Sequence, residues 1–110
     1  MINNINSLDL LEEITSKYDA VLVYFSHEQC SVCKVLKPKI VDLTLREFPE
    51  MKICYIDTKI NPEISAQFSI FAAPTILVFF AGKESIRKSR NIGIDELRDL
   101  IKRPYDMIFC

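Results

Sequence analysis

A strand-like apolar run that leads directly into a Cys-x-x-Cys pair constrains this chain more than any other feature. Residues 20–25 are apolar at both alternating sets of positions, which is typical of a strand covered by helices on both faces. Cys30 and Cys33 follow at the start of a helical pattern that runs to about Phe48, with Pro38 inside it. The sequence therefore predicts a central strand and, after it, a kinked helix that begins with two cysteines.

The spacing of these cysteines predicts redox chemistry. Helix positions three residues apart have Cβ atoms roughly 5–6 Å apart, so a small adjustment brings two sulfurs into disulfide geometry. Cys30 would stand in the first turn, where unpaired N–H groups and the positive end of the helix dipole favour the thiolate. We expect Cys30 to be the nucleophile of a pair that switches between dithiol and disulfide.

Two other interpretations of the pair remain open at this point. Cys30 and Cys33 could be ordinary helix cysteines, or they could bind zinc or an iron–sulfur cluster shared between two chains. Zinc would need two further ligands from His27, Cys54 or Cys110, and no second Cys-x-x-Cys motif supplies them at the usual local spacing. We expect no metal and no cofactor other than the cysteine pair itself.

Length and charge limit the classes of protein that fit. The 110 residues, 49% of them hydrophobic, suit a single small domain over residues 1–110. A formal net charge of −1 gives no electrostatic footprint for nucleic acid, and we assign the basic residues 87–90 to a solvated edge strand. The first residues lack a secretory signal, and no apolar run reaches the ~18–20 residues that span a bilayer. We expect a soluble, cytoplasmic protein that binds neither nucleic acid nor membrane.

The remaining patterns predict a mixed β-sheet with helices on both faces. Asn6-Ser7 can cap a first helix, and Asn61-Pro62 opens a short helix that ends near Gln67. The predicted order is helix, strand, helix, strand, helix, strand, strand, helix, which gives an α/β fold with a sheet of four or five strands. The predicted strands are residues 20–25, 51–57, 75–80 and 83–87, the last two joined by a hairpin.

The end of the chain is unusual because it is apolar. After Gly93 the pattern predicts a last helix that ends at Pro104, which leaves residues 104–110 as a tail that finishes with Cys110. This tail packs either on its own domain, which we favour, or on a second chain, so we expect a monomer or a weak dimer. Cys54 lies within a predicted strand, where we expect a small buried side chain without redox activity.

Several of these features together resemble the thioredoxin family. Lys34 follows the cysteine pair, Pro38 stands five residues after Cys33, and Ala73-Pro74-Thr75 precedes an apolar strand. The resemblance covers nearly the whole chain and implies a thioredoxin-like fold. It also implies a thiol–disulfide oxidoreductase in which Cys30 attacks a protein disulfide and Cys33 resolves the mixed disulfide. A thioredoxin-reductase-like protein would then recycle the pair.

The resemblance also implies how a partner binds. The Ala73–Pro74 peptide bond would be cis and would lie beside the cysteines. Ala73 would pair with the main chain of an extended partner segment, while Pro74 packs against the sulfurs. The residues around the cysteines, Gln29, Ser31 and Val32, would complete the binding surface.

The chain departs from the family pattern close to the cysteines. It contains no Trp, and residues 29–33 read Gln-Cys-Ser-Val-Cys where the family usually has Trp-Cys-Gly-Pro-Cys. Tyr24 stands where the family has a buried Asp that handles the proton of the second cysteine, and Ile53 stands near the place of an accompanying Lys. The residues that tune the disulfide are therefore changed.

These departures widen the set of residues that could assist exchange. Proton transfer would involve water, His27 or Glu28, and Tyr24 would belong to the core with its hydroxyl near the disulfide. Lys34 would contact the partner or favour the Cys30 thiolate. Two functions remain: a divergent oxidoreductase with a dedicated partner, or a thioredoxin-like adaptor or redox-sensing binding module.

Overall fold

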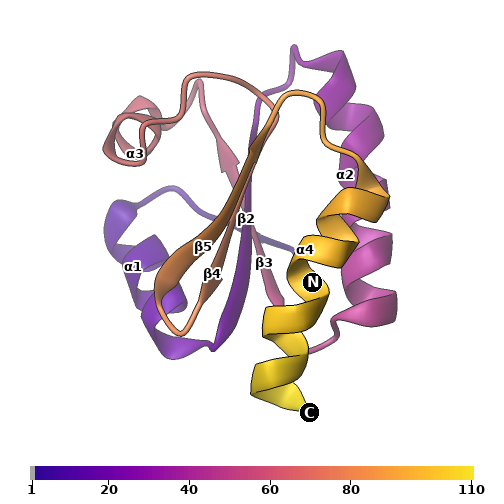
Figure 1. The fold of residues 1–110 in the computed structure, drawn as a ribbon. Coiled ribbons are helices and arrows are strands. Elements are labelled where there is room, and N and C mark those ends of the chain that lie inside the picture. The colour runs from indigo at the N-terminus through magenta and orange to yellow at the C-terminus, as the bar shows by residue number, and fades with distance from the viewer. Residues whose placement is uncertain (1) are drawn as a thin grey trace.

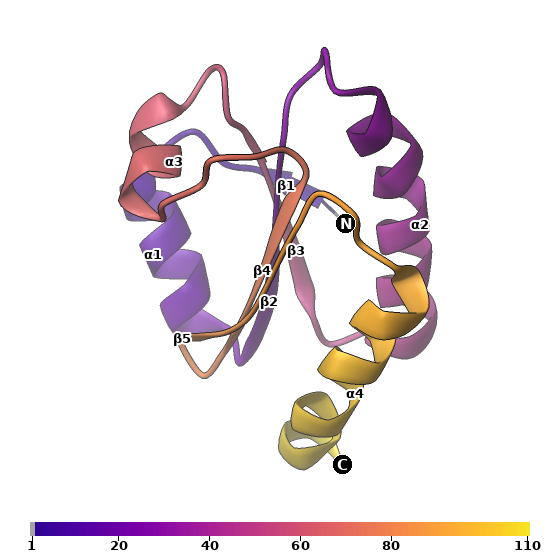
Figure 2. The ribbon, with the colours of Figure 1, turned by 45° about the horizontal axis from the view of Figure 1, so that its top comes forward.

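A central sheet lies between two pairs of helices in the computed structural model, which describes residues 2–110. Helices α1 and α3 cover one face, and α2 and α4 cover the other (Figures 1 and 2). The strands are β1 (Ile2–Asn4), β2 (Ala20–Ser26), β3 (Lys52–Asp57), β4 (Thr75–Phe80) and β5 (Lys83–Ser89). The helices are α1 (Leu8–Lys17), α2 (Ser31–Glu47), α3 (Pro62–Gln67) and α4 (Ile94–Phe109).

The strand order in the sheet is β1-β3-β2-β4-β5. Strand β2 lies at the centre, parallel to β3 and antiparallel to β4, and all seven of its residues are buried. The hairpin of β4 and β5 is antiparallel, as the sequence predicts, and its last strand forms an edge with mostly exposed side chains. The predicted mixed sheet with helices on both faces is confirmed.

Strand β1 was not predicted as an element. It pairs in parallel with β3, with Asn4 opposite Tyr55, and Ile5 then donates a backbone hydrogen bond to the Tyr55 carbonyl at 2.9 Å. A three-residue segment with two asparagines has low strand propensity, so only its pairing with β3 makes it a strand.

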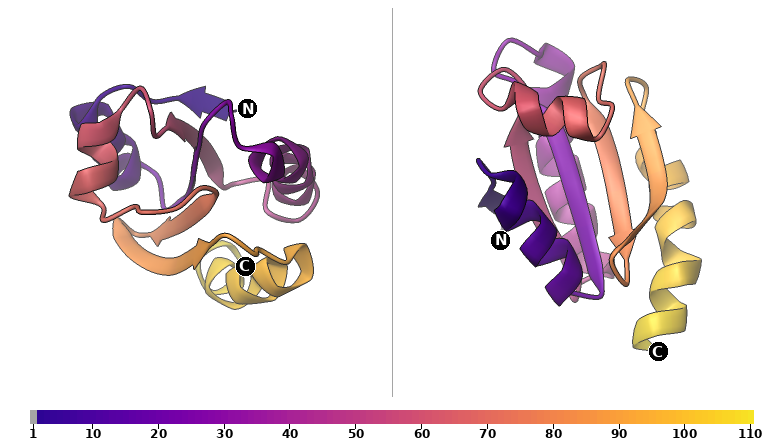
Figure 3. Two further views of the ribbon diagram at one scale, coloured as in Figure 1. Left: turned by 90° about the horizontal axis from the view of Figure 1, so that it is seen from above. Right: turned by 90° about the vertical axis from the view of Figure 1, so that its left-hand side faces the viewer.

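Each face of the sheet has its own core, and the view from above shows helices on both sides of the sheet (Figure 3). Alternation along β2 sends Leu22 and Tyr24 to one core and Val21, Val23 and Phe25 to the other. The α2/α4 core includes Tyr24, Cys33, Leu36, Ile40, Leu43, Leu97, Ile101 and Tyr105. The α1/α3 core includes Ile5, Leu11, Val21, Val23, Phe25, Cys54, Ile56, Ile64, Leu77 and Phe79.

The helix starts follow the predicted capping signals. The Ser7 hydroxyl accepts a hydrogen bond from the N–H of Leu10 at 3.0 Å, and α1 begins at the next residue after Ser7. Pro62 occupies the first position of α3 after Asn61, whose side chain bonds Asn6 and the Asp57 carbonyl instead of capping its own helix. No helix among residues 2–110 is both long enough and apolar enough to cross a membrane.

The prediction that Pro104 ends the last helix was wrong. Helix α4 continues through Pro104 to Phe109, past the end of the sheet (Figures 1 and 3). Its last turns are fixed by Tyr105, whose ring centroid lies 4.9 Å from that of Phe48 and 4.6 Å from that of Phe109. The Tyr105 hydroxyl also accepts the N–H of Glu50 at 2.9 Å. This packing outweighs the one helical hydrogen bond that proline cannot donate. It places Tyr105 and Phe109 of the apolar tail on their own domain, whereas Met107 and Ile108 stay exposed.

Candidate active site

Three loops meet at one end of the sheet (Figure 1), and one of them leads to the cysteine pair at the start of α2. These loops connect β2 to α2, α3 to β4, and β5 to α4. Two of them are tied together by the Arg90 N–H, which donates to the Pro74 carbonyl at 2.8 Å. Arg90 has a backbone φ of 64°, in the left-handed region that few non-glycine residues adopt.

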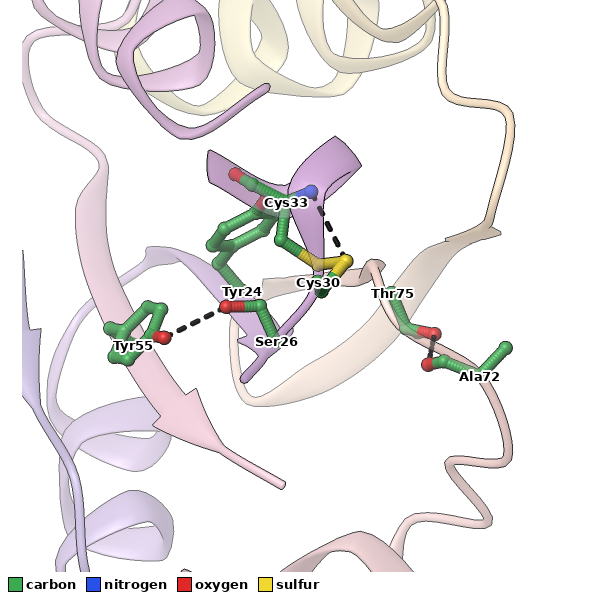
Figure 4. Close-up of a disulfide and its surroundings, with 7 residues drawn as sticks. All are labelled: Tyr24, Ser26, Cys30, Cys33, Tyr55, Ala72 and Thr75. Carbon is green, nitrogen blue, oxygen red and sulfur yellow. Dashed lines mark hydrogen bonds between the residues drawn. A yellow bond between two sulfur atoms is a disulfide. The ribbon is translucent and has the colours of Figure 1, made fainter. Parts of the chain in front are cut away.

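Cys30 and Cys33 form a disulfide at the start of α2 (Figure 4). Cys30 is the N-cap, so it precedes the first turn where the prediction had placed it, and its Cα lies 5.2 Å from that of Cys33. The N–H of Cys33 donates to the Cys30 sulfur at 3.1 Å. Cys30 is half-buried, whereas Cys33 is only 2% exposed. A thiolate at Cys30 would therefore be reachable from outside and stabilised by the helix start.

Tyr24 lies beneath Cys33 in the α2/α4 core (Figure 4). It is buried, and its hydroxyl donates to the Cys33 carbonyl at 2.7 Å. Burial, with a smaller contribution from Tyr55, raises the pKa of Tyr24 well above its usual range. Ser26 donates to the Tyr55 hydroxyl at 2.8 Å on the next strand. The hydroxyl predicted near the disulfide is thus present, and it binds a main-chain carbonyl.

The proline loop has the conformation that the resemblance implied. The Ala73–Pro74 bond is cis, and Pro74 is buried beside a half-buried Ala73. Thr75 donates through its hydroxyl to the Ala72 carbonyl at 2.7 Å, which fixes the loop where β4 begins (Figure 4). Ala73 makes no backbone hydrogen bond within the described part of the chain. Its main-chain groups are therefore free to pair with another chain.

The other residues predicted at the site surround the disulfide, and none of their side chains forms a hydrogen bond with it within the described part of the chain. His27 accepts the Cys30 N–H through its carbonyl at 3.2 Å, and its own buried Nδ1 has no partner among residues 2–110. Val32 is 59% exposed on the outer face of α2. The remaining predicted residues are exposed on the same rim: Glu28, Gln29, Ser31 and Lys34.

Two hollows flank the disulfide, and sequence reasoning missed most of their residues. One, of about 210 Å³, lies against the proline loop and includes His27 and Phe71, which is 90% exposed. The other, of about 380 Å³, includes Val32 and Ile92. A large apolar residue three positions before Pro74, next to two alanines, was the signal that could have identified Phe71.

The structure does not bring the proposed zinc ligands together. Cys54 is buried in the α1/α3 core, where burial raises the pKa of its thiol to about 11, and Cys110 is exposed at the end of α4. Within residues 2–110, no three His, Cys, Asp or Glu side chains are arranged to hold a metal ion. The cysteine pair is instead closed on itself as a disulfide.

Comparisons with known proteins agree with this geometry. The thioredoxin family model matches residues 2–103. A thioredoxin-like protein YdfQ of Bacillus subtilis is 28% identical over 94% of this chain and 92% of its own length. Thioredoxin of Chlamydia trachomatis is 33% identical over 74% of this chain and 76% of its own. The structure of Fasciola hepatica thioredoxin superposes with a TM-score of 0.82 at 29% identity, covering 92% of this chain and 97% of that one. With its Cys30–Cys33 disulfide, the chain is a thiol–disulfide oxidoreductase that belongs to the thioredoxin family.

Proposed function

We propose that Cys30 attacks disulfides of partner proteins and that Cys33 resolves the product. The Cys30 thiolate forms a bond to one partner sulfur, and the partner's second sulfur leaves as a thiolate. Cys33 then bonds to the Cys30 sulfur and releases the first partner sulfur, so the partner gains two electrons and this protein becomes oxidised. The partner is reduced to a dithiol with the two protons that the cysteine pair gives up.

One observation carries this assignment of roles. Cys30 is half-buried and accepts an N–H at the helix start, whereas Cys33 is 2% exposed and cannot meet a folded partner directly. Both sulfurs attack as thiolates, but the first must also be accessible to the partner, whereas the resolving sulfur has only to reach Cys30. The two positions match these two requirements.

We assign partner binding to the surface around the disulfide. The unpaired main chain of Ala73 supports strand-like pairing with an extended partner segment beside Pro74. Gln29, Ser31 and Val32 would border this segment on the helix side. Glu28 and Lys34 are exposed at the rim, so we assign them to partner contact rather than to proton transfer.

The partners follow from the same chemistry. The substrates would be protein disulfides, and a thioredoxin-reductase-like protein would return the oxidised pair to the dithiol. The protein would act in the cytoplasm, because thiols are kept reduced there and the protein must regain its dithiol after each cycle. The protein would act as a monomer, since the apolar Tyr105 and Phe109 of the predicted tail pack within the chain.

A trapping experiment tests the two roles. Cys33→Ser should accumulate a mixed disulfide between Cys30 and a model substrate such as insulin. This product is detected on non-reducing gels as a band of higher mass. Cys30→Ser is the matched control and should trap nothing and lose insulin reduction. The assignment fails if the roles reverse, or if Cys30→Ser still reduces insulin. An adaptor that does no exchange would bind its partner equally well with either substitution.

A further inference from the structure

The position beneath the resolving cysteine is occupied by a tyrosine that is already committed to a hydrogen bond. Tyr24 extends from β2 toward the first turn of α2, and its hydroxyl donates to the Cys33 carbonyl at 2.7 Å (Figure 4). No other side chain is shown donating to the main chain of the disulfide residues within the described part of the protein. The bond therefore links the centre of the sheet directly to the residue that must move during exchange.

We propose that Tyr24 is a positioning residue for Cys33: it holds the Cys33 main chain in both redox states and takes no proton from the thiol. The inference rests on the proposed role of Cys33 as the resolving cysteine. If Tyr24 takes no proton, this protein handles the proton of its second cysteine differently from a protein that has a buried acid beneath that cysteine.

Tyr24 binds α2 at the residue next to a break in the helix's own hydrogen bonds. Pro38 lies inside the helix and has no N–H, so the carbonyl four residues earlier, that of Lys34, loses its usual helical partner. The turn after the cysteines is therefore held by fewer internal hydrogen bonds than an ordinary helix turn. Tyr24 supplies one from β2, a strand whose seven residues are all buried. A rigid strand thus fixes the Cys33 carbonyl where the helix is weakest.

The same geometry prevents Tyr24 from acting as a base. A phenol that accepts a proton must first be a phenolate, but this hydroxyl uses its proton to bind a carbonyl. Burial raises the pKa of Tyr24, so the neutral phenol persists throughout the physiological range. β4 presents only the apolar Ile76 opposite Tyr24, and Ile53 of β3 lies in the same core. The titratable groups that contact Tyr24 are Cys33, whose carbonyl it binds, and Tyr55, whose ring centroid lies 6.1 Å from its own; Lys37 lies over the other ring, that of Tyr55.

The proton of Cys33 must then leave on the open side of the disulfide. When Cys33 bonds to the Cys30 sulfur, the electron pair of the broken bond goes to the partner sulfur. Cys33 attacks as a thiolate after giving its proton to solvent, and the departing thiolate takes a proton from solvent according to its own pKa, so neither a buried acid nor an added reagent is required. The rate of this step should follow ionisation of the thiols alone.

The test compares Tyr24→Phe with Tyr55→Phe. Each removes one hydroxyl and keeps its ring, but only the first breaks a bond to a disulfide residue. The mixed disulfide of Cys30 with 5-thio-2-nitrobenzoate reports closure by Cys33 through release of the coloured thiolate, measured from pH 5 to 9. Tyr24→Phe should slow closure by about 2- to 10-fold, the worth of one net hydrogen bond, and leave the shape of the pH profile unchanged. Tyr55→Phe should change closure by less than about 2-fold.

Three results would overturn the proposal. Loss of an ionisation from the Tyr24→Phe profile would show that Tyr24 carries the proton, and equal closure in both variants would show that its bond positions nothing. If Tyr24→Phe fails to fold, the proposal can still be tested on the wild-type protein. NMR should then show slow exchange of the Tyr24 hydroxyl proton with solvent in both redox states. Its loss of protection in the dithiol would refute a bond held in both states. If wild-type Cys33 releases no thiolate at all, the failure lies with the proposed exchange roles and not with Tyr24.

Discussion

Cys33 and Cys54 are buried to nearly the same extent, yet they lie on opposite faces of the sheet in very different surroundings. Cys33 is 2% exposed in the α2/α4 core, and Cys54 is 0% exposed in the α1/α3 core. Cys33 adjoins a helix start, a tyrosine hydroxyl and a second sulfur. Cys54 stands in mid-strand among apolar side chains, and burial raises the pKa of its thiol to about 11.

The difference shows that burial alone does not decide what a cysteine does. Desolvation without compensating groups keeps a thiol protonated, and this describes Cys54. A helix start supplies N–H groups and a favourable dipole, and the disulfide partner Cys30 stands at its N-cap. Position at a helix start is therefore what distinguishes the reactive Cys30–Cys33 pair from the structural thiol of Cys54.

Alkylation rates give the largest expected contrast between these two environments. A thiol with a pKa of about 11 is thiolate in roughly one molecule in 10³ at pH 8, and Cys54 is also fully enclosed. In the reduced Cys110→Ser protein, iodoacetamide should modify Cys30 at least about 10³-fold faster than Cys54. Peptide mass analysis over time measures both rates. In urea the two rates should converge, and similar rates in the folded protein would contradict the contrast.

The sequence was sufficient for most of the fold because its elements are strongly patterned. The apolar runs of β2 and β4, the cap before α1 and the proline at the start of α3 each give a local signal. The two errors have a different origin. Strand β1 exists through pairing with β3, and α4 continues past Pro104 through the packing of Tyr105 on Phe48. Both depend on contacts distant in sequence, which override local propensity.

The site could be predicted in part for the same reason. The cysteine pair and Pro74 have local signatures, and the structure places both at one end of the sheet. Tyr24 was predicted near the disulfide, but its bond to the Cys33 carbonyl was not, because it depends on which face of β2 meets the first turn of α2. Exposure of Phe71 likewise depends on how its loop passes over the surface. Orientation between elements is what the sequence alone did not supply.

Substitution of Cys54 should affect stability and spare exchange. Cys54→Ser places a hydroxyl in an apolar core and should lower the free energy of unfolding by about 1–3 kcal/mol. Cys54→Val keeps the site apolar but adds one heavy atom, and it should cost about 1 kcal/mol. Urea unfolding measures both, and insulin reduction should remain at the wild-type rate. A serine variant as stable as the valine variant would mean that a polar partner reaches this site.

Reduction of the Cys30–Cys33 disulfide should affect both stability and chemistry, unlike any change at Cys54. The disulfide joins residues three apart and restricts the unfolded chain, so breaking it raises the entropy of the unfolded state. By the loop-closure relation, the reduced form should be less stable by about 2 kcal/mol. Urea unfolding of the oxidised and reduced forms should show this difference, and Cys30→Ser should unfold like the reduced form. If the two forms were equally stable, the dithiol would have to gain compensating bonds in the folded state.

The smallest expected effect concerns an ion pair that steadies the loop leading to Pro74. Arg87 on β5 bonds Glu84 at 2.8 Å and also donates to the carbonyls of Phe68 and Ser69 at 2.9 and 3.3 Å. Phe68 packs on the α1/α3 core that contains Cys54, so Glu84 orients an arginine that links this core to the proline loop. The hydrogen bond from Arg87 lowers the pKa of Glu84.

Glu84→Gln should therefore be less stable at neutral pH by no more than about 1 kcal/mol, because side chains a third exposed are screened by solvent. A carboxyl with a lowered pKa in the folded state stabilises above its unfolded value of about 4.3 and loses this effect as pH falls through the folded value. The difference between wild type and Glu84→Gln in urea unfolding should thus disappear as the pH falls below the lowered pKa of Glu84, and high salt should reduce it. Alkylation of Cys54, which requires opening of its core, should quicken slightly in the variant at pH 8, while that of Cys30 should not. A difference that persists in acid would mean that packing, not charge, links the loop to the core.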